Sequence, residues 1–192
     1  MSRRSVDPPD HAVAPDRHPD APAPGERLGS HYGSCFGCGT DHPTGLHMDV
    51  TAGDGCRIHA EFTVTEHHQG APGLAHGGVL AAAFDEALGA VTWLLRQPAV
   101  TAHLETDFRC PVPVGTTVYI TAECVAVAGR KVYSRAVGRM GAPDGAVGVE
   151  AAAVFVTVPM QHFRDHGRPE DVAAFVASAD RATVTSGFEV NP

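Results

Sequence analysis

Asp85 stands in the middle of a long apolar run, where a carboxylate costs desolvation free energy unless the protein needs it there. Burial is expected to raise its pKa, which suits a group that takes a proton from water or attacks a carbonyl carbon. The alternative is a structural carboxylate that caps a neighbouring backbone group. Glu86 is adjacent but points roughly 100° away around a helix, so we keep it as the second candidate for a base.

The tripeptide His76-Gly77-Gly78 opens the same run. If a helix begins there, its first backbone N–H groups point outward and carry partial positive charge. The two glycines let a ligand approach the backbone closely, so a carbonyl oxygen that gains negative charge could be stabilised there, as in an oxyanion hole. The alternative is that the glycines only relieve a tight turn and that His76 caps the helix.

The spacing of these two features has a consequence for assembly. Gly77 and Asp85 are eight residues apart, which is about 12 Å along a helix axis. One carbonyl carbon cannot touch both, so if both act on one carbonyl they must come from different chains. Antiparallel packing of two such helices across a two-fold axis would bring the start of one near the middle of the other. The spacing therefore predicts an active site shared within a dimer.

One helix between two groups of strands positions these residues. The run from Gly77 to Leu95 predicts a helix that Pro98 ends, and it is apolar nearly all the way round, as a buried helix is. Alternating apolar residues between turn residues predict strands over 46–50, 57–65, 100–109, 116–127, 131–140 and 147–158. This order predicts an α+β fold in which a curled antiparallel sheet wraps around one long central helix. Such a small sheet leaves an edge uncovered, so we expect a second copy to cover it.

Composition divides the chain into three parts. Residues 1–30 hold six prolines and four aspartates and predict a disordered tail. Residues 31–160 hold the predicted strands and helix and form the domain. Residues 161–192 form a C-terminal extension, in which Val172, Phe175 and Val176 predict a short helix.

Charge and composition exclude several classes of protein. The 192 residues carry 22 acidic against 14 basic side chains, a formal net charge of −8, and Lys131 is the only lysine. An acidic chain without a basic block predicts no nucleic-acid partner and no binding to an anionic membrane. We count no apolar run that approaches the ~20 residues of a membrane span. Five cysteines form no disulfide framework, so we expect a soluble cytoplasmic protein.

The segment from Ala75 to Asp85 resembles the signature of the hotdog-fold acyl-CoA thioesterases, in particular their PaaI-like branch, and the resemblance extends over about residues 35–158. It implies that His76 and Gly77 start the central helix and polarise the thioester carbonyl. It also implies that Asp85 is the catalytic base or nucleophile and that Thr101, near the start of the next strand, positions the water.

The same resemblance assigns substrate-binding roles. Arg130 and Lys131 match a turn that often contacts the phosphates of coenzyme A, and Gly78 belongs to the helix start that the substrate approaches. Many relatives carry an Asn or Gln about seven residues before the oxyanion glycine. Position 70 is Gly here, so Gln69 would take this role only after a one-residue shift of the loop.

The activity implied by the resemblance is hydrolysis of an acyl-CoA thioester, with the acyl chain between the central helices of two protomers. Coenzyme A enters as part of the substrate, and no cofactor or metal is expected. We expect a homodimer, with a dimer of dimers left open. Two other functions also stay open. One is a non-catalytic module that binds acyl-CoA or an acyl carrier, and the other is a hotdog dehydratase or hydratase that uses His76 and Asp85.

Cys35 and Cys38 allow two interpretations. Together with His42 and His47 they could form a compressed zinc knuckle. The simpler interpretation, which we favour, is two small buried residues in a tight N-terminal turn, and it agrees with the expectation that the protein needs no metal. The run from Cys35 to Gly39 also recurs at the head of the thioesterases that the chain resembles.

Overall fold

The computed structural model describes residues 6–179 of the chain. Within this part, strands and one long helix form the body, and shorter helices flank it. In chain order the elements are β1 (Arg27–Leu28), β2 (Asp49–Ala52), β3 (Arg57–Thr63), η1 (Glu66–His68), α1 (Gly77–Ala90), η2 (Val91–Leu95), β4 (Ala99–Phe108), β5 (Thr117–Ala128), β6 (Lys131–Met140), β7 (Val147–Thr157), α2 (Gln161–His166) and α3 (Pro169–Ala179).

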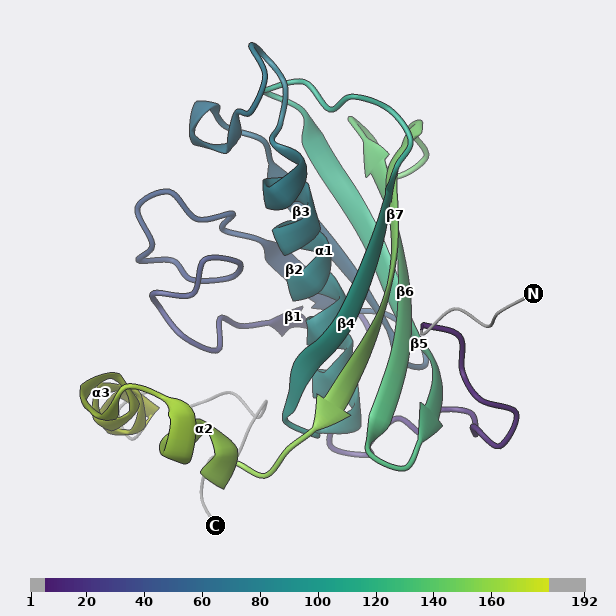
Figure 1. The fold of residues 1–192 in the computed structure, drawn as a ribbon, viewed down its shortest axis with the longest axis vertical. Helices are drawn as coiled ribbons and strands as arrows, with labels where there is room; N and C mark the ends of the chain where they lie inside the picture. Colours follow the sequence, from purple (N-terminus) through teal and green to yellow (C-terminus); the bar gives the residue numbers. More distant parts are fainter. Residues whose placement is uncertain (1–5, 180–192) are drawn as a thin grey trace.

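The strands of the described residues form one seven-stranded antiparallel sheet in the order β1-β2-β3-β5-β6-β7-β4. Figure 1 shows the sheet curling around α1, with β4 passing in front of the helix. The core lies between the helix and the concave face of the sheet, because the buried residues of α1 and of the strands belong to one cluster. The predicted fold, a curled antiparallel sheet around one central helix, is confirmed.

Helix α1 lies close to the sheet because small residues occupy the contact. Ala83 and Ala87 are fully buried, and the ring of Phe84 is buried over Gly138 on β6. A Cβ at Gly138 would come within 2.5 Å of that ring, so the missing side chain makes the space that Phe84 fills. The apolar side chains that alternate along the strands thus pack against a helix whose residues are small where it comes closest to the sheet.

The central helix extends beyond α1 as the 3-10 turns of η2, and Arg96, with φ 51°, ends it in the left-handed conformation. The combined run Gly77–Leu95 has 19 residues, and by length and composition it is apolar enough to cross a membrane, which corrects our count from the sequence. Its window of highest hydropathy is 56% buried inside the fold. Packing against the sheet accounts for the apolar composition of this run.

The predicted strands match the observed ones within about three residues at their ends. The difference at β2 has a local cause. Leu46 donates its backbone N–H to the carbonyl of Phe36 at 2.7 Å, and Met48 donates to that of Gly37 at 2.9 Å. Residues 46–48 therefore pair with the N-terminal loop before β2 joins the sheet at Asp49.

The segment from residue 6 to residue 30, where composition predicts a disordered tail, lies against the sheet in this structure. Val13 forms an antiparallel bridge with Val127, and Val6 is buried against Tyr133 on the face of the sheet that points away from α1. Arg17 donates hydrogen bonds to the carbonyl of Gly53 and to neighbouring carbonyls. Backbone pairing and a few buried side chains hold a segment that has little apolar material of its own.

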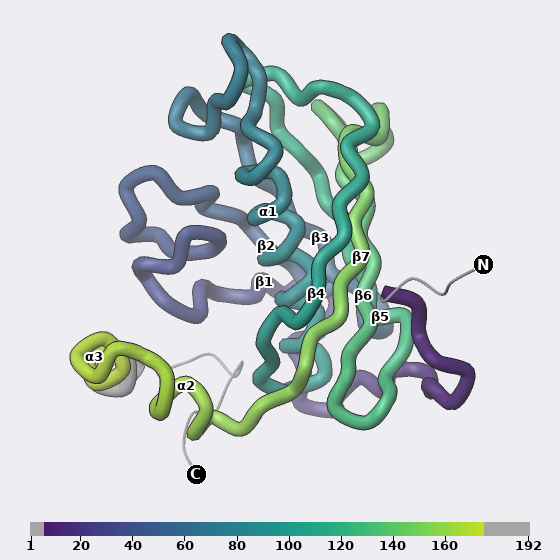
Figure 2. The backbone as a smooth tube through the Cα atoms, viewed as in Figure 1, coloured from purple at the N-terminus to yellow at the C-terminus, as the bar shows by residue number. Residues whose placement is uncertain are grey.

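The C-terminal extension forms two short helices rather than one. Figure 2 shows α2 and α3 leading away from the end of β7, apart from the sheet. The side chain of Arg168 bonds the carboxylate of Asp171 at 2.6 Å in the first turn of α3. Val172 is half-buried, whereas the side chains of Phe175 and Val176 lie outside the described residues.

Candidate active site

Asp85 on α1 meets Thr101 on β4. The hydroxyl of Thr101 donates to Oδ1 of Asp85 at 2.8 Å, and the carboxylate is half-buried while the threonine is exposed. Burial raises the pKa of Asp85 above its ordinary value, and the hydrogen bond from Thr101 acts in the opposite direction. The pair thus offers a carboxylate of increased basicity beside a hydroxyl that can also accept a hydrogen bond from water.

At the start of α1, His76 is the N-cap, and its Nδ1 accepts a hydrogen bond from the N–H of Gly78 at 2.9 Å. The capping role that we considered for His76 is therefore present, and the N–H of Gly78 is already engaged. Gly77 provides the first N–H of the helix, and the first N–H groups of a helix have no acceptor within it. The ring of Phe108 on β4 lies over this glycine, 3.5 Å from where a Cβ would stand.

The two halves of the predicted site are separate within one chain. Gly77 and Asp85 lie on the same continuous helix, so the helix rise places them about 12 Å apart along its axis. The structure brings Asp85 and Thr101 together, and it brings His76, Gly77 and Gly78 together at the other end.

Gln69 lies beside the helix start but is engaged within its own loop. Its backbone forms an isolated bridge with Ala75, and its Oε1 accepts the N–H of Gly73 at 2.9 Å. A Cβ at Gly70 would come within 2.9 Å of the Cα of His76. An Asn or Gln at position 70 would therefore clash in this loop, which explains physically why glycine stands there.

Arg130 and Lys131 are exposed at the turn between β5 and β6. They border a shallow cavity of about 480 Å³ on the face of the sheet opposite α1, since Tyr133 in its wall belongs to the outer cluster. The cavity is lined by Pro9, His11, Ala128, Arg130, Lys131, Tyr133 and Val156. The two cations lie near the strand ends that also carry Thr101, because Lys131 pairs with Val156 and Thr101 with Phe155.

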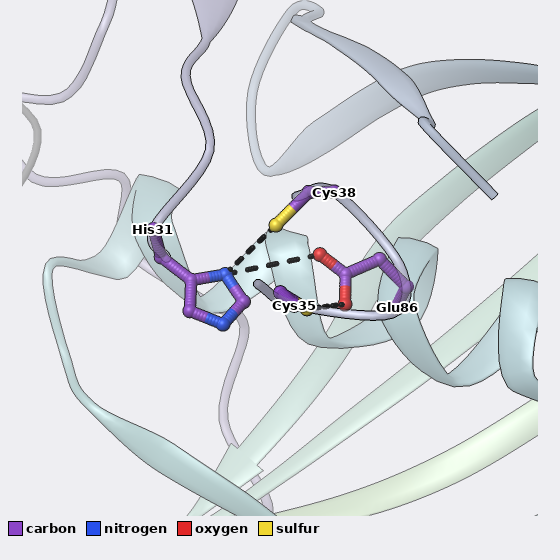
Figure 3. A group of neighbouring side chains, drawn as sticks. All are labelled: His31, Cys35, Cys38 and Glu86. Atoms are coloured by element: carbon purple, nitrogen blue, oxygen red, sulfur yellow. Dashed lines mark hydrogen bonds and ion pairs between the residues drawn. The ribbon is translucent and has the colours of Figure 1, made fainter. Parts of the chain in front are cut away.

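Glu86 points toward the N-terminal loop that carries Cys35 and Cys38 (Figure 3). Its carboxylate lies 3.7 Å from the sulfur of Cys35 and 3.9 Å from Nδ1 of His31. One ligating atom from each of His31, Cys35, Cys38 and Glu86 lies within 4.8 Å of all the others, and we call these four residues the His-Cys-Cys-Glu cluster. Burial raises the pKa of Glu86.

The two thiols of the cluster share their environment. The pKa of the Cys35 thiol is lowered to about 3 by its contact with Cys38, with burial acting the other way, and the pKa of Cys38 is raised by the same contact. His42 and His47 do not join them. His42 Nδ1 accepts the N–H of Thr44 at 3.3 Å, and His47 Nδ1 lies 2.9 Å from the carbonyl of Gly39. The ligand set of the compressed zinc knuckle is thus not what the fold assembles.

Sequence reasoning missed His31 and Glu86 as neighbours of the cysteines. Glu86 is 51 residues from Cys35, and no local spacing rule relates them. The available signal was that two adjacent carboxylates on one helix cannot both face the same strand.

Part of the chain matches known proteins. A family model described as the thioesterase superfamily matches residues 72–141. This stretch includes Asp85, Thr101 and the turn with Arg130 and Lys131, which we call the basic turn. The acyl-coenzyme A thioesterase THEM4 of Xenopus laevis is 34% identical over 88 residues, which are 46% of this chain and 39% of that protein. The chain therefore spans well under half the length of the curated relatives that it matches.

Solved structures agree with this match. The crystal structure of a thioesterase superfamily protein is 28% identical, with a TM-score of 0.59 over 71% of this chain and 69% of that one. The PaaI protein of E. coli has the same fold, with a TM-score of 0.55 at 18% identity over 59% of this chain and 81% of that one. Residues 72–141 thus match the thioesterase superfamily, and the chain has the hotdog fold of these solved structures. The resemblance to the PaaI-like branch that the sequence indicated is confirmed.

Proposed function

We propose that this chain hydrolyses acyl-CoA thioesters to a free acid and coenzyme A. The observation that carries the proposal is the 2.8 Å hydrogen bond between Thr101 and the half-buried carboxylate of Asp85. It joins the one carboxylate that faces β4 from α1 to a hydroxyl that can hold water. The match of residues 72–141 to the thioesterase superfamily and the similarity to an acyl-coenzyme A thioesterase support the choice of substrate.

In the proposed reaction Thr101 holds a water molecule beside Asp85. The carboxylate takes one proton from the water while the oxygen of that water bonds to the thioester carbon. The carbonyl oxygen thereby becomes an oxyanion. The oxyanion then re-forms the carbonyl while the carbon–sulfur bond breaks. The leaving thiolate takes the proton from Asp85, so the products are a carboxylic acid and a thiol. A direct attack by Asp85 would form an acyl–aspartyl anhydride, which water then hydrolyses.

The oxyanion in this proposal is bound by the N–H of Gly77 from the partner protomer. Supporting this assignment, the N–H of Gly78 is engaged by His76, whereas Gly77 opens the helix. A dimer is supported by the sheet edge. Among the described residues β4 pairs with β7 on one side only, and Phe108 at its end is 53% exposed beside Gly77. A second copy would cover this edge and bring two α1 helices together.

Arg130 and Lys131 are proposed to bind the phosphates of coenzyme A. Their exposure at one turn and the shallow cavity beside them support this role, because phosphate groups remain partly hydrated when they are bound at a surface. In this assignment the basic turn contributes to substrate affinity and takes no part in bond breaking.

The test is a thiol-release assay over acyl-CoA substrates of increasing chain length, with the wild-type protein and Asp85→Asn. We expect release by the wild-type protein on at least one acyl class and its loss in the variant. Binding of acyl-CoA without thiol release would favour the non-catalytic binding module instead. That alternative is supported by the engagement of Gln69 with Gly73, which leaves its oxygen occupied. A single turnover in ¹⁸O-labelled water reveals the anhydride if water attacks its aspartyl carbon, because the first product then carries an unlabelled oxygen of Asp85.

A further inference from the structure

The His-Cys-Cys-Glu cluster joins two parts of the chain that the sheet does not connect. His31, Cys35 and Cys38 come from the loop before β2, and Glu86 comes from the middle of α1 (Figure 3). Cys38 is buried, Cys35 and Glu86 are half-buried, and only His31 is exposed. The cluster is therefore a partly buried group of ligating atoms that the proposed hydrolysis does not use.

The distances within the cluster suit a tetrahedral metal ion. Zinc–sulfur bonds of about 2.3 Å and zinc–nitrogen or zinc–oxygen bonds of about 2.0 Å put neighbouring ligand atoms about 3.3 to 3.8 Å apart. In the cluster, His31 Nδ1 lies 3.0 Å from Cys38 Sγ and 3.9 Å from Glu86 Oε1, and Cys35 Sγ lies 3.7 Å from Glu86 Oε2. These separations lie on both sides of the tetrahedral values, and all four ligating atoms are within 4.8 Å of one another, so an ion at the centre would need side-chain adjustments of up to about 1 Å.

The loop is built to hold both sulfurs in this place. The N–H of Gly39 donates to the carbonyl of Cys35 at 2.9 Å, which closes the turn that carries the two cysteines. A Cβ at Gly39 would come within 2.4 Å of that carbonyl, and a Cβ at Gly37 would come within 2.4 Å of the Glu86 carboxylate. Both glycines thus allow the close approach of the turn to itself and to α1. The hydroxyl of Ser30 donates to the sulfur of Cys38 at 3.7 Å, as an outer partner of a ligand does.

The donor set selects the class of metal. Two thiolates and one imidazole are ligands that zinc prefers, whereas magnesium and calcium take oxygen ligands. Four protein ligands leave no open position for water or substrate, which is the arrangement of a structural site and not of a catalytic one. We propose that His31, Cys35, Cys38 and Glu86 bind one zinc ion that fastens the N-terminal loop to the central helix.

Binding balances charge within the cluster. Both cysteines bind as thiolates, a thiol that still carries its proton releases it to solvent, and His31 binds as the neutral imidazole. Two thiolates and the Glu86 carboxylate carry three negative charges, and the divalent ion reduces the net charge of the site to −1. The ion thereby relieves the repulsion between groups that the fold holds within 4.8 Å of one another. This site is independent of the proposed hydrolysis, and its test measures metal and not activity.

The first experiment measures metal in the full-length protein purified without chelator and under reducing conditions. We expect about one zinc per chain in the wild-type protein, and less than about 0.2 in Cys35→Ser and in Cys38→Ser. Glu86→Gln, which removes a charge but keeps the shape, should bind zinc more weakly in competition with a chromophoric chelator. Cys110→Ser and His42→Ala are matched controls, since each replaces a half-buried thiol or an imidazole outside the cluster, and they should keep the wild-type zinc content.

The second experiment keeps the proposal falsifiable if the cysteine variants fail to fold. Wild-type protein is stripped of metal with a chelator and titrated with cobalt(II). We expect a thiolate-to-cobalt charge-transfer band and the intense visible bands of tetrahedral cobalt, saturating at one equivalent and displaced by zinc. Zinc well below one per chain with no such bands would overturn the proposal. An unchanged zinc content in Cys35→Ser would also overturn it. The same holds for a disulfide between Cys35 and Cys38 that persists in protein kept reduced and supplied with metal.

Discussion

Asp85 and Glu86 are neighbours on one helix and lie in different surroundings. Asp85 faces β4, which is an edge strand of the sheet that the described residues form, and receives a hydrogen bond from the hydroxyl of Thr101. Glu86 faces the N-terminal loop and lies among two sulfurs and an imidazole. Both carboxyl groups have a pKa raised by burial, so the pKa shift does not distinguish them. They differ in their neighbours, because the helix rotates by about 100° per residue and so turns the two side chains toward different parts of the chain. A site with an open side can admit substrate, whereas one enclosed by four protein ligands can only hold an ion.

The largest expected effect separates the two carboxylates by activity. Asp85→Asn keeps the size of the side chain and its acceptor for Thr101, but it removes the group that takes the proton. We expect thiol release to fall at least ~10²-fold while the circular dichroism spectrum stays unchanged. Glu86→Gln should reduce turnover less than ~10-fold, because it acts only by loosening the loop from α1. A larger loss in Glu86→Gln than in Asp85→Asn would reverse our assignment of the two residues.

A smaller effect is expected at the other end of the Asp85 hydrogen bond. Thr101→Val has the same shape without the hydroxyl, so the attacking water would lose one of its two hydrogen-bond partners. Since a hydrogen bond of this kind is worth on the order of 1 kcal/mol, we expect kcat to fall roughly 5- to 10-fold. Thr101→Ser restores the hydroxyl and should recover most of the activity. If the serine variant is as slow as the valine variant, Thr101 acts through packing and not through its oxygen.

Metal removal should affect stability on the Glu86 side. A ligand present at about 1,000 times its Kd stabilises the folded state by about 4 kcal/mol, so a chelator under reducing conditions should lower the midpoint of thermal unfolding of the wild-type protein by several degrees. Cys35→Ser should already unfold at the lower temperature, and the chelator should not lower it further. Equal sensitivity of both proteins to the chelator would locate the effect outside the His-Cys-Cys-Glu cluster.

The smallest expected effect concerns the basic turn, which is remote from both carboxylates. Replacing Arg130 and Lys131 together with alanine should raise KM for an acyl-CoA several-fold and leave kcat unchanged, because the phosphates lie far from the scissile bond. A short acyl thioester without the nucleotide should be hydrolysed as by the wild-type protein. Equal losses on both substrates would mean that the turn is structural and that the phosphates bind elsewhere.

The sequence predicts the Asp85 side of the helix well because its determinants are local. Alternating apolar residues mark β4 to β7, and the His-Gly-Gly start with an acid nine residues after the histidine marks the helix and its carboxylate. Thr101 follows at the head of the next strand. Each of these signals lies within one element, or in two elements that are adjacent in the chain.

The His-Cys-Cys-Glu cluster around Glu86 was not predictable in the same way. The cysteines and His31 belong to a loop whose path depends on backbone pairing of Phe36 and Gly37 with Leu46 and Met48, and composition does not report such pairing. For the same reason the prediction of a disordered tail over residues 1–30 differs from what the structure has for residues 6–30. A bridge between Val13 and Val127 joins positions more than a hundred residues apart, and the paired β1 has only two residues.

The central claim, that Asp85 of one protomer works with Gly77 of its partner, is tested most directly by mixing two inactive variants. One carries Asp85→Asn, and the other carries His76→Ala with Gly77→Val, which blocks approach to the helix start. Each homodimer has a lesion in both of its sites, whereas a mixed dimer gathers both lesions in one site and leaves the other intact. After subunit exchange, verified by native mass spectrometry, we predict that activity recovers to about a quarter of the wild-type value, because half of the dimers are mixed and each has one intact site. No recovery despite verified exchange would contradict a shared site and the account built on it.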